Sequence, residues 1–433
     1  MFLGGIFRVY WWFPSYICWT SLEEPGLSTR TFQMIAVSEA ESIIRGTLVP
    51  CATESVSLIA SHGRILRESI FADRDQPPFN RVTMDGIAFD SARVLGGQRR
   101  FRVAGVQAAG AEPLSLSDGD TCFEVMTGAV LPTGSNAVVR IEDIMLADGW
   151  ATIDESVRAA EWQNVHRTGS DHARGTELLR AGCVLRSPEI AVAASVGKST
   201  LLVARPPRVA VVSTGDELVD VGDSPLPHQI RRSNSYAIQA ALFRIGVTQV
   251  TPMHVRDERD TMESAIASLL DEHDLLILAG GVSMGRFDYV PDVLAAVGVD
   301  CQFHGVRQRP GKPMWFGVGR RQQPVFALPG NPVSTLVCLH RYVLPAIAAS
   351  LGAPDDEAIL IVTNSEHVFK PRLTLFLPVS VVSRADGVLS ARLNPTNGSG
   401  DYGGLAGTTG FIELDEQTEY FPSGTVARHW NWF

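Results

Sequence analysis

The region between residues 206 and 351 constrains the fold more than any other part of this chain, because short apolar runs alternate there with segments of helical periodicity. Residues 209–212 and 275–278 are entirely apolar. Strands that alternate with helices form a mostly parallel sheet, and strands without polar residues are covered by helices on both faces. Residues 204–352 are therefore predicted to form a doubly wound α/β domain.

The remaining sequence divides into segments of different character, since 433 residues exceed what one hydrophobic core usually holds together. Residues 34–83 and 166–203 have mostly helical patterns, and we expect them to form one discontinuous helical domain. Residues 84–165 contain short β-type runs between glycines and prolines, which predicts a small β-rich domain. We expect a C-terminal β domain over residues 357–433, and an N-terminal extension of unknown role over residues 1–33. The predicted fold class is α/β multi-domain.

The charge of the chain argues against two classes of partner. The formal net charge is −10 at pH 7, which gives no basic footprint for nucleic acid or an anionic membrane. The six cysteines are scattered singly, as is typical of reduced and mostly buried thiols. The aromatic run 9–13 is broken by Pro14 and is too short to span a bilayer. We therefore expect a cytoplasmic protein without nucleic-acid or membrane partners.

Unusual loops follow the predicted strands of the α/β domain, at the edge where open parallel sheets bind their ligands. The first run leads into residues 213–218, which place the carboxylate of Glu217 at a strand exit. The second run leads into a glycine-rich stretch, 280–285, with Asp288 shortly after it. Backbone NH groups of such a turn, ahead of a helix, can surround a phosphate. A bridging Mg²⁺ would relieve the repulsion between a phosphate and the two carboxylates.

Two further loops add cations and rigidity to the predicted site. One carries Arg307, Arg309 and Lys312 around a Pro-Gly turn, which suits a tetrahedral oxyanion. The other, 328–334, contains two prolines ahead of a helix, and a restricted loop loses less entropy when a ligand orders it. Simpler interpretations stay open for all these loops. They are a plain tight turn, solvated or helix-capping carboxylates, a solvated cationic loop and a rigid helix lead-in.

The motifs, taken in order, resemble those of the molybdopterin molybdenumtransferase family, known as MoeA in bacteria and as the gephyrin E domain in animals. Any single motif is weak, whereas seven in the same order are specific. The resemblance extends from about Met34 to the end of the chain. The seven motifs occupy residues 83–88, 125–129, 164–167 with Gly169 and Asp171, 213–218, 280–285 with Asp288 and Tyr289, 309–313 and 328–334.

The resemblance implies a homodimer of elongated four-domain subunits. Molybdate and adenylylated molybdopterin would be the substrates, and molybdate would be inserted into the dithiolene with release of AMP. Mg²⁺ would assist the reaction. An adenylyltransferase and a molybdoenzyme would be candidate partners, since they act before and after this step.

The resemblance also carries functional roles over to residues of this chain. Glu217 and Asp288 match the metal and phosphate-site carboxylates, and Ser399 matches a serine of the last domain. The residues expected to be catalytic are Glu217, Asp288, Asp257, Asp85 and Lys312. The residues expected to bind substrate are Thr127, Asp171, Gly280, Gly281, Ser283, Gly285, Arg307, Arg309, Pro329, Pro332 and Ser399.

The cation loop departs from the family pattern. Arg309 stands where lysine is frequent, and Gly305 occupies a second common lysine position, so that one cation is missing. Arg307 is the candidate replacement. In the last domain, Leu377 occupies a frequent arginine position.

Two other functions fit parts of the sequence. One is the adenylyltransferase that makes the adenylylated substrate, whose domain resembles residues 204–352 but usually reads Gly-Gly-Thr-Gly at positions 280–283. The other is a catalytically weakened, molybdopterin-binding scaffold, for which the missing cation is the argument. The presence of Glu217, Asp288 and Lys312 argues against the scaffold.

We predict that removal of residues 1–31 changes neither melting temperature nor activity. The helical pattern and the family resemblance both begin near Met34, so the truncation leaves every recognised motif in place. Differential scanning calorimetry of the truncated and full-length chains checks this. A clear fall in melting temperature would show that the aromatic segment is packed.

Overall fold

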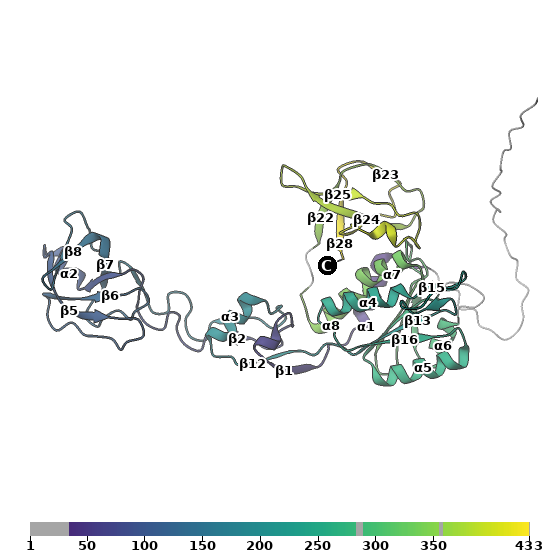
Figure 1. Ribbon diagram of the computed structural model, residues 1–433, viewed down its shortest axis with the longest axis horizontal. Coiled ribbons are helices and arrows are strands. Elements are labelled where there is room, and N and C mark those ends of the chain that lie inside the picture. Colours follow the sequence, from purple (N-terminus) through teal and green to yellow (C-terminus); the bar gives the residue numbers. More distant parts are fainter. Residues whose placement is uncertain (1–33, 283–288, 355–357, 433) are drawn as a thin grey trace, which may run out of the picture.

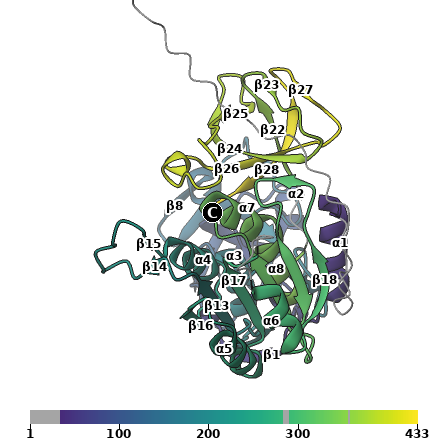
Figure 2. The ribbon, with the colours of Figure 1, turned by 90° about the vertical axis from the view of Figure 1, so that its right-hand side faces the viewer.

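The computed structural model describes residues 34–282, 289–354 and 358–432, so the N-terminal extension lies outside the described residues. The chain is elongated, with a β-rich body at one end and a small middle region next to it (Figure 1). The α/β domain lies at the other end. Figure 2 shows the C-terminal β domain seated on the α/β domain.

A six-stranded sheet with helices on both faces forms the α/β domain within the described residues, which confirms the predicted fold class. Four neighbouring strands are parallel, and each of the two strands at one edge is antiparallel to its inner neighbour. In spatial order the strands are β16 (Val250–Val255), β13 (Val209–Thr214), β17 (Leu275–Ala279), β21 (Pro324–Leu328), β20 (Trp315–Val318) and β18 (Asp300–His304).

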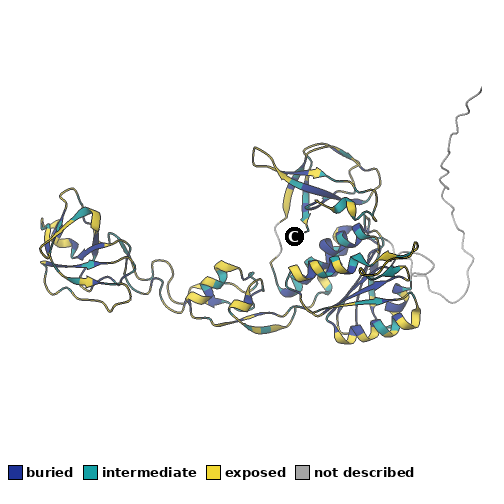
Figure 3. Ribbon diagram, viewed as in Figure 1, coloured by how far each residue is buried: buried dark blue, intermediate teal, exposed yellow. Residues whose placement is uncertain are grey.

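Helices cover both faces of this sheet and create two cores. Val209 and Val211 of β13 pack in one core, whereas Ala210 and Val212 pack in the other, because alternate residues of a strand point to opposite faces. Figure 3 shows the buried strands between helices whose outer faces are exposed. The helices of the first face are α4 (Ser233–Arg244), α7 (Pro332–Cys338), the π-helical turn η3 (Leu339–Val343) and α8 (Leu344–Leu351), and those of the second are α5 (Arg259–Glu272) and α6 (Val290–Ala296).

The segment Pro332–Leu351, which joins α7, η3 and α8, is the one helix of the described residues that is long and apolar enough to cross a membrane. Most of it is buried inside the protein, as expected of a core helix.

The middle region joins strands from both of the stretches predicted to be helical. β1 (Thr53–Ser57) pairs with β12 (Thr200–Ala204), and β2 (Ile70–Phe71) pairs with β11 (Glu177–Leu179). Leu66, Ile70 and Leu201 lie in its small core. Pairing between strands far apart in the sequence therefore outweighs the local helical pattern.

Residues 34–83 and 166–203 are thus less helical than the sequence predicts. Over these fully described stretches, helix is confined to α1 (Val37–Thr47), the short turn η1 (Ile59–Ser61) and α3 (Ser187–Ser195). α1 leaves the middle region altogether, because its buried residues pack in a core of the α/β domain.

The β-rich body at the far end contains a second sheet. Its core includes Phe89 and Phe101, whose ring centroids lie 5.3 Å apart. The short pair β3 (Arg81–Val82) and β10 (Val165–His166) lies where the chain enters and leaves this body. In spatial order the strands are β7 (Ala137–Arg140), β4 (Gly86–Phe89), β6 (Thr121–Val125), β5 (Arg100–Gln107), β9 (Trp150–Ile153) and β8 (Ile144–Ala147), accompanied by α2 (Ser91–Leu95) and η2 (Ile141–Asp143).

The C-terminal β domain is a sheet that closes on itself through pairing of β24 with β26. A short strand of the cation loop, β19 (Gln308–Arg309), also pairs with β24, so the two domains share a sheet. The strands are β24 (Thr374–Ser383), β25 (Leu389–Leu393), β22 (Ile359–Thr363), β28 (Val426–Asn431) and β26 (Gly410–Leu414), with the pair β23 (His367–Val368) and β27 (Tyr420–Phe421) and the turn η4 (Gly403–Leu405).

A buried ion-pair network on Arg341 of η3 joins three parts of the chain. Its side chain is 4% exposed and contacts Glu41 of α1 at 2.9 Å and Glu413 of β26 at 3.1 Å. Trp430 donates to Glu413 and also lies against the guanidinium, 4.5 Å from ring centroid to Cζ. Burial disfavours the charge of Arg341, but Glu413 and Glu41 outweigh this effect and raise its pKa. The network therefore locks α1 and the C-terminal β domain to the α/β domain.

We predict that Arg341→Met lowers the free energy of unfolding by about 3–5 kcal/mol, because it leaves two partly buried carboxylates without their counter-charge. Urea denaturation followed by tryptophan fluorescence measures the change. The matched control is Arg384→Met, which removes an exposed ion pair with Asp386 and should lower stability by less than about 1 kcal/mol. Equal losses in the two variants would contradict a structural role for the network.

Candidate active site

A pocket of about 1060 Å³ lies at the carboxyl end of the parallel strands, where the sequence predicts the ligand-binding loops. The loops after β13, β17 and β21 line it, together with the cation loop 309–313. The C-terminal β domain contributes the stretch between residues 395 and 400. β14 (Leu218–Val219) and β15 (Ile230–Arg231) form an arm beside it that projects from the domain (Figure 2). The pocket thus lies between two domains.

Two carboxylates line this pocket from neighbouring strands. Glu217 follows β13, and Asp257 follows β16. Gly215 has φ +138°, and a Cβ at this position would lie 2.7 Å from an oxygen of Glu217. Glycine is therefore needed for the Glu217 carboxylate to fold back against the strand exit.

The glycine turn after β17 is also part of the pocket wall. Gly280 and Gly281 have positive φ, and the backbone NH of Gly280 donates to Leu328 O at 3.1 Å. A Cβ on Gly281 would come within 2.6 Å of the Val290 side chain, so both conformation and space require glycine. The predicted Ser283, Gly285 and Asp288 lie outside the described residues.

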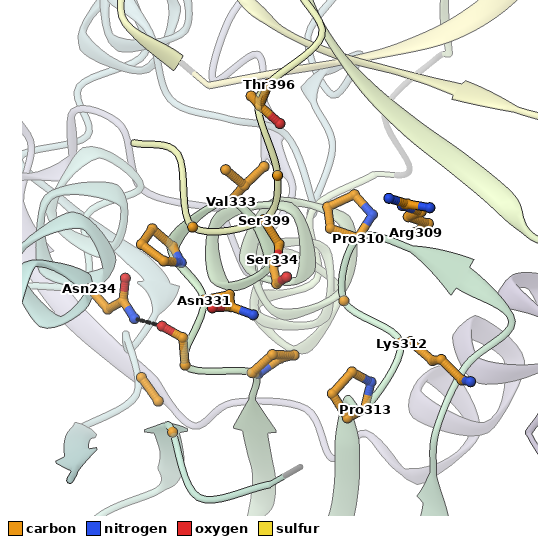
Figure 4. Close-up of a pocket in the computed structure, with 18 of the residues that line it drawn as sticks. Asn234, Arg309, Pro310, Lys312, Pro313, Asn331, Val333, Ser334, Thr396 and Ser399 are labelled. Carbon is orange, nitrogen blue, oxygen red and sulfur yellow. Dashed lines mark hydrogen bonds between the residues drawn. The ribbon is translucent and has the colours of Figure 1, made fainter. Parts of the chain in front are cut away.

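Arg309 and Lys312 bring positive charge to the pocket from the cation loop (Figure 4). The buried side chain of Gln308 holds this loop in place. Its amide NH₂ donates to Pro310 O at 3.2 Å and to Cys338 Sγ at 3.4 Å, and its amide oxygen accepts from the Tyr342 hydroxyl. Burial raises the pKa of the Cys338 thiol to about 12, so that it stays uncharged. The two cations are thus presented on a loop with a buried anchor.

Arg307 lies outside the lining of the pocket, in contrast to its predicted role. Its guanidinium binds the Glu416 carboxylate at 3.3 Å and the Met34 carbonyl at 3.1 Å. Gly305 is buried against Met34 and does not line the pocket either. Arg307 therefore ties the start of the described chain to the C-terminal β domain and does not replace the missing cation in this structure.

The helix lead-in and the C-terminal domain complete the pocket. Pro329 and Pro332 line it, and the NH of Val333 donates to Ser399 O at 2.9 Å. Figure 4 shows Ser334 and Ser399 close together at its centre. Leu377, at the position where the resemblance leads one to expect arginine, lines the pocket with an apolar side chain.

Sequence reasoning missed the lining residues Arg231, Arg232 and Asn234. Asn234 donates to Gly330 O at 2.8 Å and accepts from the Tyr402 hydroxyl at 3.0 Å. The sequence feature that could have identified them is the pair Arg231-Arg232, directly before the helix predicted near residue 234.

A second polar cluster lies in the distant β-rich body and its stem. The NH and hydroxyl of Thr127 donate to Asp85 Oδ1 at 2.6 and 2.8 Å, and these hydrogen bonds lower the pKa of Asp85. Asp171 contacts His166 at 2.8 Å. The predicted residues Asp85, Thr127 and Asp171 are thus outside the lining of the pocket in the same chain.

Two family models match most of the chain up to the end of the α/β domain. A model of the MoeA N-terminal region (domain I and II) matches residues 35–197, and a model of a probable molybdopterin binding domain matches residues 210–349. A molybdopterin molybdenumtransferase of Synechocystis sp. is 38% identical over 400 residues, covering 92% of this chain and 100% of that protein. One of Staphylococcus epidermidis is 35% identical, covering 74% of this chain and 76% of that protein.

A solved structure agrees with this relationship. The molybdopterin biosynthesis MoeA protein from Pyrococcus horikoshii superposes with a TM-score of 0.76 at 27% identity, covering 93% of this chain and 100% of that one. The similarity thus extends well beyond the α/β domain that an adenylyltransferase would share. The chain belongs to the molybdopterin molybdenumtransferase family of molybdenum cofactor biosynthesis.

Proposed function

We propose that this protein inserts molybdate into adenylylated molybdopterin and releases AMP. The observation that supports this most is the lining of one pocket by carboxylates, Glu217 and Asp257, and by cations, Arg309 and Lys312. The cations suit a tetrahedral oxyanion such as molybdate. The carboxylates suit a metal-bound phosphate. Both substrates therefore find complementary groups in a single site.

Mg²⁺ is the metal that Glu217 and the predicted Asp288 would hold. No group of three or more His, Cys, Asp or Glu side chains within the described ranges is arranged to hold a metal by itself. Two carboxylates nevertheless fit Mg²⁺, which usually keeps several waters and takes one or two carboxylates together with substrate phosphates. Glu217 would hold it, with Asp288 as the predicted second ligand. Bound there, the metal would stabilise the charge that develops as the phosphoanhydride breaks.

A homodimer would explain the position of the second cluster. Asp85, Thr127 and Asp171 lie on the β-rich body and its stem, far from the pocket along the molecule (Figure 1). If the β-rich body of one subunit lay over the pocket of the other, these polar groups would complete the site. The elongated shape of the chain favours such an arrangement.

The experiment that tests the function is molybdate-dependent AMP release from adenylylated molybdopterin. We expect AMP release with Mg²⁺ and molybdate, and a loss of at least about 100-fold in Glu217→Gln, which keeps the size of the side chain but removes the negative charge that binds the metal. An adenylyltransferase would instead form the adenylylated compound from ATP, and a scaffold would bind it without release. Either result with the wild-type protein would contradict the proposal.

We predict different effects for two arginines of the cation loop. Arg309→Ala should raise the molybdate concentration needed for half-maximal AMP release roughly tenfold, because a charge-assisted hydrogen bond is lost from the pocket. Arg309→Lys should be tolerated better. Arg307→Ala should leave this concentration within about twofold and lower the melting temperature, because Arg307 holds Glu416. The opposite pattern would place the oxyanion at Arg307.

A further inference from the structure

A second pocket, of about 320 Å³, lies at the amino end of the parallel strands, opposite to the first pocket. Leu275, the first residue of β17, lines this second pocket, whereas Ala279, the last residue of the same strand, lines the first. The two pockets are therefore about 13 Å apart along β17, at roughly 3.3 Å per residue. The volume lies within the range of small-molecule sites, about 300–1,000 Å³. The second pocket shares no lining residue with the first within the described part of the chain.

Both connections between the middle region and the α/β domain run along the second pocket. Residues 49–52 lead from α1 to β1, Arg205 leads from β12 to β13, and all of them line the pocket. These two linkers are bonded to each other, because the NH of Arg205 donates to Ala52 O at 2.7 Å. The NH of Cys51 donates to Ser350 O at 2.8 Å and so holds the first linker on α8. A ligand in the second pocket would therefore contact both linkers.

Apolar side chains from four segments line the second pocket. Leu275 at the start of β17 and Ile347 of α8 are buried, and so is Pro207 before β13. Pro324 at the start of β21 is half-buried, and Val49 of the first linker is exposed. The wall thus changes from buried to exposed apolar residues, as expected of a groove with a floor and a rim. Such walls favour a ligand with an apolar body.

The charges of the second pocket leave one cation in excess. Asp274 is held by Arg208, whose guanidinium donates to its two carboxylate oxygens at 3.3 and 3.0 Å. Burial raises the pKa of the Asp274 carboxyl, but Arg208, helped by the charge of Arg205, outweighs this effect and lowers it. Arg321 donates to Leu270 O at 2.6 Å, at the end of α5. The exposed side chain of Arg205 makes no hydrogen bond or ion pair within the ranges that the structure describes, so its charge is available to an anion.

We propose that the second pocket binds an organic anion with an apolar body. The charged group of the ligand pairs with Arg205, and its apolar part lies against Leu275 and Ile347. Because the ligand bridges the two linkers, it stabilises the arrangement of the middle region and the α/β domain that the structure shows. The site is independent of the proposed reaction, since its lining residues are separate from those of the first pocket among the described residues.

Fluorescence titration of the full chain with two probes tests the class of ligand. The anionic probe is anilinonaphthalene sulfonate, and the neutral probe is phenylnaphthylamine, which has the same aromatic body without the sulfonate. We expect Arg205→Gln to weaken binding of the anionic probe about tenfold, because a charge-assisted hydrogen bond is lost, and to change binding of the neutral probe by less than about twofold. Arg205→Lys keeps the charge and should retain most of the affinity for the anionic probe.

The matched control is Arg158→Gln in the β-rich body. Arg158 is also exposed and makes no hydrogen bond or ion pair with the described residues, so the variant makes the same charge change far from the second pocket. It should bind both probes like the wild type. Both glutamine variants should keep the melting temperature within about 2 °C, because an exposed side chain without a partner contributes little to stability.

Hydrogen–deuterium exchange with and without the anionic probe locates its site. The probe should slow exchange in peptides that contain residues 49–52 and 205–208, because it bridges the two linkers, and this protection should disappear in Arg205→Gln. Absence of protection in the linkers would overturn the proposal, and protection of the cation loop 309–313 instead would place the probe in the first pocket.

Three titration results would also overturn the proposal. Unchanged affinity of Arg205→Gln for the anionic probe would mean that Arg205 is not its partner. An equal loss of affinity for the neutral probe would mean that the variant alters the shape of the pocket and not its charge. Displacement of the anionic probe by an equal concentration of inorganic sulfate would mean a site for simple anions, without apolar contacts.

Discussion

The placement of Arg341 between Glu41 and Glu413 is the interaction on which the pocket depends. It is buried in the helix that starts at the pocket, and its partners come from the first helix and from the last domain. A buried charge of this kind is stable only when its counter-charges are in place, so the three parts must assemble together. The C-terminal residues that line the pocket, such as Ser399, are positioned as a consequence of this assembly and of the β19–β24 pairing.

The negative and the positive side chains of the pocket come from different structural elements. Carboxylates follow β13 and β16, whereas cations come from the loop around residue 310 and from the start of α4. Opposite charges at different walls of one pocket fit the proposed binding of a metal-bound phosphate at one wall and of a free oxyanion at another. Such a division suits a reaction in which an anion enters as a phosphoanhydride is broken. A surface of uniform charge could not hold both groups in order.

The elements that are determined by the hydrophobic pattern of their own residues could be predicted from the sequence. The apolar runs of β13 and β17 are buried on both faces, and the strand-exit loops meet in one pocket as their positions require. The strand β1 lies in a stretch predicted to be mostly helical, because its partner β12 lies far along the chain and leaves no mark on the local pattern. The sequence predicts Arg307 in the site, because only the fold brings Glu416 and the Met34 carbonyl next to it as partners. The sequence thus predicts which loops line the site, but not which group each side chain contacts.

Unpaired donors at the end of β13 lower the stability of the α/β domain. In the unliganded chain, burial of the Ser213 and Thr214 hydroxyls without a partner is unfavourable, and their replacement by apolar groups would remove that penalty.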